Sequence, residues 1–138
     1  RAPTRLPQEV TAMAKRKSIH IAGFKHGNPI PAATRMGPLI VSSVIVGRDP
    51  STAEMPDDID RQCANIFAHV RAMLAEAGAT PEDVVKMDFW VPDPATGRGA
   101  INQEWVRMFP DFDSCPARHT HTGGGKTVQA TFMAYIER

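Results

Sequence analysis

Arg118 is the residue whose surroundings most clearly suggest chemistry. It lies in residues 115–122, an alternating run that ends at three glycines. Side chains alternate across a β-strand, so Arg118 shares one face with Thr120 and Thr122. A guanidinium is a planar, permanently charged fork of donors that can hold a carboxylate in a bidentate pair. The run therefore predicts a site for a small carboxylate. The alternative is an ordinary arginine that pairs with a surface acid.

A second pattern lies on the other face of the same run, where His119 and His121 stand two residues apart. Two imidazoles on one strand face can bind a metal ion. No third ligand stands at a suitable spacing, and only the distant His20 or His26 could supply one. We therefore expect a structural or surface role for the pair, no metal site and no cofactor.

The element that positions Arg118 is predicted to be an antiparallel hairpin. Residues 115–122 and 127–136 both alternate, and a glycine-rich turn separates them. The second run has one apolar face and one mixed face, and the mixed face carries Gln129 and Thr131. The hairpin would place Arg118 beside threonine and glutamine side chains.

The rest of the chain alternates between strand and helix patterns. In order, we expect a strand at 18–24, a loop at 25–35, a strand at 39–46, a helix from 59 to Gly78 capped by Asp57 or Asp58, a strand at 84–91, and a short helix at 101–109. Ser42 and Ser43 interrupt the strongest strand, either as satisfied core hydroxyls or as the floor of a polar pocket. His69 is expected at the solvated edge of its helix.

These elements predict an α+β fold with two helices on one face of a mixed sheet. At least two strands are apolar on both faces, and two helices can cover only one of them. The uncovered face should therefore pack against something else, and another copy of the chain is the simplest candidate.

Size and charge exclude several classes of function. The 138 residues suit one domain at 18–138, preceded by a basic extension at 1–17 that we expect to be a solvated tail or a short helix. The net charge of +1 favours neither nucleic acid nor membrane as a partner. No apolar run reaches the roughly 20 residues of a membrane span, and residues 1–17 lack a secretory signal pattern. With two cysteines, a reduced cytoplasmic setting is the simpler assumption, although a disulfide stays open.

Several short pieces, in this order and spacing, resemble the Rid family, the reactive intermediate deaminases also called L-PSP endoribonucleases or translation inhibitors. The similarity covers about residues 18–138. It rests on 39–43 (Leu-Ile-Val-Ser-Ser), Asn65, Leu74, 77–78 (Ala-Gly), 83–86 (Asp-Val-Val-Lys), Asn102, Trp105, Phe109 and 116–118 (Pro-Ala-Arg). The resemblance implies a chorismate-mutase-like fold, a barrel-like homotrimer, and ligand sites in the clefts between subunits.

The resemblance also implies roles for individual residues. Arg118 matches the arginine that clamps the substrate carboxylate, and Thr120 lines the same pocket. Ser42 and Ser43 match the family's Ser-Gly pair. Members with the full site hydrolyse enamines and imines to ammonia and a 2-keto acid, using a bound water and no cofactor.

This sequence departs from the family pattern where protons are handled. Ile30 replaces a tyrosine, and the family's glutamate falls at Gln129 or, with a shifted alignment, at Thr131. Neither side chain can accept a proton near neutral pH. The resemblance therefore leaves two main readings, an imine or enamine hydrolase and a non-catalytic binder of small carboxylates. A ribonuclease is the third reading, but it needs a basic groove with stacking aromatics.

Overall fold

The computed structural model describes residues 15–137, so the tail or short helix expected at the start of the chain lies, up to residue 14, outside the described residues. The elements, in chain order, are β1 (Arg16–Ile19), β2 (Ala33–Met36), β3 (Leu39–Ser42), β4 (Ile45–Val46), α2 (Ile59–Glu76), the 3₁₀ turn η1 (Pro81–Asp83), β5 (Val84–Val91), α3 (Pro94–Met108), β6 (Ala117–Thr122) and β7 (Gln129–Tyr135). No helix among the described residues is both long and apolar enough to cross a membrane.

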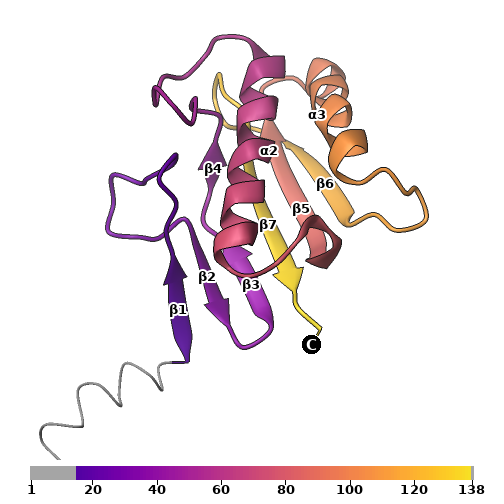
Figure 1. The fold of residues 1–138 in the computed structure, drawn as a ribbon. Helices are drawn as coiled ribbons and strands as arrows, with labels where there is room; N and C mark the ends of the chain where they lie inside the picture. Colours follow the sequence, from indigo (N-terminus) through magenta and orange to yellow (C-terminus); the bar gives the residue numbers. More distant parts are fainter. Residues whose placement is uncertain (1–14, 138) are drawn as a thin grey trace, which may run out of the picture.

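The strands form one mixed sheet in the order β1-β2-β3-β7-β5-β6, with β4 also paired to β7. The β5–β6 pair is parallel, and the other pairs are antiparallel. Both α2 and α3 lie against the same face of this sheet, which we call the helix face (Figure 1). The opposite face, called here the open face, has no helix from residues 15–137 over it. The α+β fold with two helices on one face, as predicted, is confirmed.

The helix face holds the core. Side chains of α2 at helical spacing, including Ile66, Val70 and Met73, are fully buried and share one core cluster with alternate residues of β5 and β7. The helix begins after Asp58, whose carboxylate accepts a hydrogen bond from the Asp60 N–H at 3.2 Å. It ends before Gly78, whose φ of 79° lets the chain turn away without strain. Both predicted ends of this helix are confirmed.

The predicted hairpin between residues 115–122 and 127–136 is wrong. Strand β5 lies between β6 and β7 and pairs with both. The chain reaches β6 through α3, which gives a parallel β5–β6 pair, and then crosses the end of β5 to reach β7. The glycines make this crossing possible, because a Cβ at Gly124 would lie 2.6 Å from the Thr127 carbonyl oxygen, and its φ is 82°.

Other predicted boundaries also shift. The loop expected at 25–35 ends early, because β2 begins at Ala33, and α3 begins at Pro94 instead of near residue 101. The Asp93 carboxylate caps α3 by accepting from the Ala95 N–H at 3.1 Å. The strand expected at 39–46 is split into β3 and β4 next to the two serines.

A bulge in β5 changes which side chains face the core. The pairing register shifts between Val84 and Lys86. As a result Val84 is buried, whereas Val85 is 48% exposed. Strict alternation along the strand would instead place Val85 on the same face as Met87, and Val84 on the other face.

Five large apolar side chains stand exposed on the open face. The register of β2, β3 and β7 places them on one surface, called here the open-face patch: Met36, Leu39, Val41, Met133 and Tyr135. Their exposed fractions lie between 39% and 50% in the single chain. Among the described residues, strand β3 is therefore covered on one face only, and its second apolar face is exposed.

Candidate functional site

Arg118 points to the helix face at the β6 edge of the sheet. It lies level with Met87 of β5, whose side chain is buried on that face. Its Nη1 donates to Oδ1 of Asn102 at 2.8 Å, and its Cζ lies 5.0 Å from the ring centroid of Trp105. Both partners come from α3. The helix therefore orients the guanidinium through one hydrogen bond and one cation–π contact.

A cavity of about 400 Å³ lies beside this guanidinium, between α3 and the start of β6. It is lined by Asn102, Trp105, Val106, Phe109, Pro110, Phe112, Cys115, Pro116 and Arg118. The walls are mainly aromatic and aliphatic, and Arg118 is the single charged residue in this lining. Such a cavity suits a small anion that also carries an apolar part.

The electrostatic setting of Arg118 favours an anion. Burial lowers the pKa of Arg118, because it disfavours the charged guanidinium, and the nearby positive charge of Arg98 lowers it further. Arginine nevertheless stays protonated at any working pH. Among residues 15–137, no carboxylate forms an ion pair with Arg118. The alternative prediction was that Arg118 pairs with a surface acid. Within residues 15–137 the structure shows no such pair.

Thr120 shares the helix face with Arg118, level with Phe89, and is half-buried. The shared face is confirmed. Thr120 does not line the cavity beside Arg118. Its role in a pocket stays a prediction.

Gln129 and Thr131 lie on the open face of β7. Gln129 is level with Trp90 of β5, and Thr131 is level with Asp88. Arg118 points to the opposite face, and β5 separates β7 from β6. One chain therefore does not bring either candidate for the family's proton-handling position next to the guanidinium.

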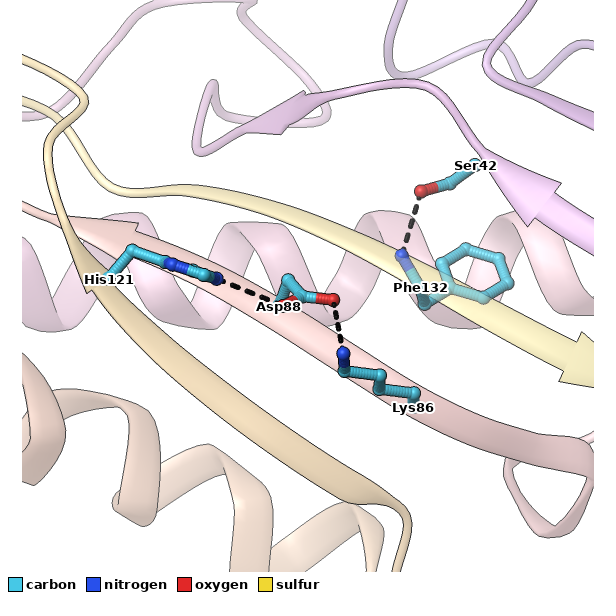
Figure 2. A network of polar contacts seen from close by, with 5 residues as sticks. All are labelled: Ser42, Lys86, Asp88, His121 and Phe132. Carbon is cyan, nitrogen blue, oxygen red and sulfur yellow. Dashed lines mark hydrogen bonds and ion pairs between the residues drawn. The ribbon is translucent and has the colours of Figure 1, made fainter.

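The remaining predicted residues form a third group near the bend between β3 and β4. The Ser42 hydroxyl oxygen accepts from the Phe132 N–H at 2.9 Å (Figure 2), and the Ser43 hydroxyl donates to the Pro31 carbonyl at 2.8 Å. Both serines are thus hydroxyls with backbone partners. Ile30 is 46% exposed and lines a separate cavity of about 420 Å³ together with His20 and His26.

Neither cysteine forms a disulfide. Cys63 lies on the buried face of α2, where burial raises the pKa of its thiol to about 12. A thiol with such a pKa is protonated at neutral pH and is not a nucleophile. Cys115 is exposed at the edge of the Arg118 cavity, and its thiol lies 3.2 Å from the Asp111 carbonyl oxygen.

Two contacts of the site could not be assigned from the sequence. Asn102 and Trp105 stand three residues apart, which places them on one face of α3. That spacing was visible in the sequence, but the sequence did not show that this face of α3 lies against Arg118 of β6. Asp88, which pairs with His121 at 3.0 Å on the open face, was missed for the same reason.

Comparison with known proteins places the chain in a family. The family model described as Endoribonuclease L-PSP matches residues 25–123. A RutC family protein of Haemophilus influenzae is 33% identical over 92 residues, which cover 65% of this chain and 70% of that protein. A RutC family protein of Aquifex aeolicus is 28% identical over 92 residues, covering 67% of this chain and 73% of that protein.

Solved structures share the fold. The YjgF gene product of E. coli superposes with a TM-score of 0.77 at 21% identity, covering 88% of this chain and 99% of that one. RidA from Psychrobacter gives a TM-score of 0.77 at 22% identity, covering 87% and 99%. These likenesses agree in topology with the mixed sheet and two helices described above. The chain therefore belongs to the Endoribonuclease L-PSP family, the Rid family that its sequence resembles.

Proposed function

We propose that this chain hydrolyses reactive enamines or imines that carry a carboxylate, and that Arg118 holds the carboxylate. One observation carries the proposal: a half-buried guanidinium, without an acidic partner among residues 15–137, borders a cavity with apolar walls. A charged donor fork that lacks an anion in a partly desolvated place is suited to bind one. Membership of the Rid family supports the same substrate class.

The proposed reaction requires the protein only to bind, polarise and position its substrate. Water adds to the imine carbon, the carbon–nitrogen bond breaks, and ammonia and a 2-keto acid leave. A bound guanidinium draws electron density from the carboxylate and so makes the neighbouring imine carbon more electrophilic. It also fixes the position of that carbon, which removes orientational freedom before the water attacks. The apolar walls, formed by Trp105 and Phe109 among others, would exclude bulk water.

The cavity offers no side-chain carboxylate as a general base, because its polar lining consists of Asn102, Cys115 and Arg118. Loss of general-base help typically costs about 10²–10⁴-fold in rate. An imine reacts with water even without a catalyst, so its hydrolysis can still be accelerated by a site that lacks a general base. We therefore expect slow turnover, with Gln129 as the limiting position if two copies bring it near Arg118.

The second candidate function is non-catalytic binding of a small carboxylate metabolite. The same lack of a carboxylate in the cavity favours it. RNA is not proposed as a ligand, since non-specific single-strand binding uses an extended basic groove, whereas Arg118 is the single charged group of this cavity.

Two assays on the same preparation distinguish the hydrolase from the binder. Calorimetry with pyruvate measures carboxylate binding, and ammonia release from freshly generated 2-aminoacrylate measures hydrolysis. The hydrolase predicts that both are present and that Arg118→Ala removes both. If the protein binds pyruvate but ammonia is released no faster than in buffer, the hydrolase is excluded and non-catalytic binding remains.

Replacing Gln129 and Thr131 with glutamate, one at a time, tests which of the two positions can carry the general base. We expect Gln129→Glu to raise ammonia release, by up to about 10²-fold, because it supplies the missing proton acceptor. Thr131→Glu is the matched control, as it adds the same charge one step along the same strand face. A larger gain from Thr131→Glu would move the assignment to Thr131. No gain from either variant would contradict a catalytic role for this face of β7.

We further propose a homotrimer in which the open-face patch, on β2, β3 and β7, is covered by neighbouring copies. The open-face patch supplies the apolar surface for such contacts. An assembly of this kind would let the Arg118 of one copy approach residues of another. It would also explain why the residues matched to the family site lie on both faces of a single sheet.

A further inference from the structure

A cluster of three metal-ligating side chains stands on the open face, away from the Arg118 cavity. Asp88 comes from β5, and His119 and His121 come from β6. One ligand atom of each residue lies within 4.8 Å of the other two. Asp88 and His121 are half-buried, and His119 is exposed. Figure 2 shows Asp88 between His121 and Lys86, with dashed contacts to both.

The parallel β5–β6 register creates this cluster. It places His119 level with Asp88, and His121 follows two residues later on the same face. The Nε2 atom of His121 lies 3.0 Å from Oδ1 of Asp88. The sequence displayed the two histidines but not the third ligand, because Asp88 belongs to a strand that only the fold brings alongside.

The chemistry of the set is that of a metal centre. Two imidazole nitrogens and one carboxylate oxygen are ligands that Zn²⁺, Fe²⁺, Ni²⁺ and Cu²⁺ accept. We infer that Asp88, His119 and His121 bind a divalent transition-metal ion, with Zn²⁺ as the reference case. Three protein ligands leave at least one coordination position for water or a small anion.

The observed spacing is close to what a bound ion needs. Ligand atoms on one tetrahedral Zn²⁺ lie roughly 3.4 Å apart, given metal–ligand distances near 2.1 Å. The Asp88–His121 pair already has 3.0 Å between its atoms. The third ligand is the exposed His119, whose ring can rotate toward the other two without disturbing the core.

An ion pair alone accounts for only part of the cluster. Asp88 and His121 would suffice for a salt bridge, and Trp90 supports that imidazole by stacking at 4.8 Å between ring centroids. His119 instead stacks on His121 at 3.8 Å and has no hydrogen-bond partner among residues 15–137. A second imidazole placed face to face with the first adds little to an ion pair, whereas a metal site requires it.

Lys86 provides an internal competitor for the ion. Its Nζ lies 3.7 Å from Oδ2 of Asp88, so its positive charge occupies part of the carboxylate that a metal would use. The Lys86 side chain is 46% exposed and has a long flexible stem, so it can swing into solvent. Metal binding should therefore displace Lys86, and removing its charge should strengthen binding.

Calorimetric titration of the chelator-treated 138-residue chain with ZnCl₂ tests the inference. Wild type should bind one Zn²⁺ per chain, and Co²⁺ should give the visible absorption of a nitrogen- and oxygen-ligated ion. His119→Ala should weaken binding by more than the roughly 10–100-fold that loss of an outer-shell partner costs. Lys86→Met should tighten it. His20→Ala is the matched control, since it removes an exposed histidine outside the cluster and should change nothing.

Circular dichroism confirms that each variant is folded, and His119 suits the test because its exposed side chain carries little of the core. The opposite effects expected for His119→Ala and Lys86→Met decide the question without a variant of the half-buried Asp88. Equal affinity in wild type and His119→Ala, an equal loss in His20→Ala, or no binding at millimolar Zn²⁺ would overturn the site.

Discussion

At the scale of single residues, a side chain's type suggested its chemistry, but its burial decided its state. Arg118 could be singled out from the sequence as a carboxylate ligand, yet its contacts with Asn102 and Trp105 depend on α3 lying over β6. The prediction for His69 was wrong. It was expected to be solvated, whereas it is 1% exposed and its Nε2 lies 2.7 Å from the Arg48 carbonyl oxygen.

The buried His69 should make stability depend on pH. Burial lowers the pKa of His69 below its usual 6.5, because it disfavours the charged ring, and the hydrogen bond to Arg48 and the charge of Asp49 only partly oppose this. The unfolded chain therefore binds the proton more readily than the folded chain. The contribution of neutral His69 is complete above pH 6.5 and is lost as the pH falls toward the folded-state pKa.

We expect the unfolding free energy of wild type to fall as the pH drops below about 6.5. His69→Gln keeps a donor for the Arg48 carbonyl oxygen but cannot titrate, so its stability should fall less over that range. Urea unfolding of both proteins at several pH values measures the difference. Parallel curves for the two proteins would show that His69 does not carry this pH dependence.

At the scale of elements, local patterns predicted what local forces determine. Helix α2, with its apolar spacing, Asp58 cap and terminal Gly78, was predictable at both ends, as was the buried face of β7. The partner of β6 was not, because a short glycine-rich link fits a hairpin as well as a crossing over β5. The bulge at Val85 was not predictable either, since it changes the alternation without any special residue.

Two glycines of α3 should respond in opposite ways to alanine. A Cβ at Gly97 would lie 2.7 Å from the Val91 Cβ, where α3 packs on β5, whereas a Cβ at Gly99 would meet nothing within 4 Å. Gly97→Ala should lose about 1–3 kcal/mol of unfolding free energy through overpacking. Gly99→Ala should gain about 0.5–1 kcal/mol, because alanine loses less entropy in a helix.

Chemical denaturation of the two variants beside wild type provides the measurement. Gly97→Ala should also weaken pyruvate binding, since α3 carries Asn102 and Trp105 to the Arg118 cavity. Gly99→Ala should leave that binding unchanged. Equal stability of the two variants would contradict the close approach of α3 to Val91 at Gly97.

At the scale of the whole molecule, the single chain leaves the apolar side chains of the open face exposed, and burying them requires another molecule. Two helices cover one face, and the open-face patch leaves large apolar side chains in solvent. The sequence pointed to this imbalance because β3 is apolar on both faces. It did not show how the site residues divide between the faces, since that division follows from β5 lying between β6 and β7.

Light scattering should report three times the mass of one chain at micromolar concentration. Met133→Lys should break the assembly, because it places a charge in the open-face patch, where Met133 is 42% exposed. Ala72→Lys adds the same charge on the exposed side of α2 and should leave the trimer intact. A monomeric wild type, or a Met133→Lys protein as trimeric as wild type, would contradict this use of the face.

The central claim is that Arg118 is the carboxylate clamp, and pyruvate calorimetry across three variants tests it most directly. Arg118→Ala should weaken binding by about 10²-fold or more, since charge-assisted hydrogen bonds contribute roughly 1.5–3 kcal/mol each. Arg118→Lys should recover only part of the affinity, because it keeps the charge and loses the planar fork. Arg98→Ala, which removes an exposed positive charge from α3, should bind nearly as wild type does. Equal pyruvate affinity in wild type and Arg118→Ala would place the clamp elsewhere.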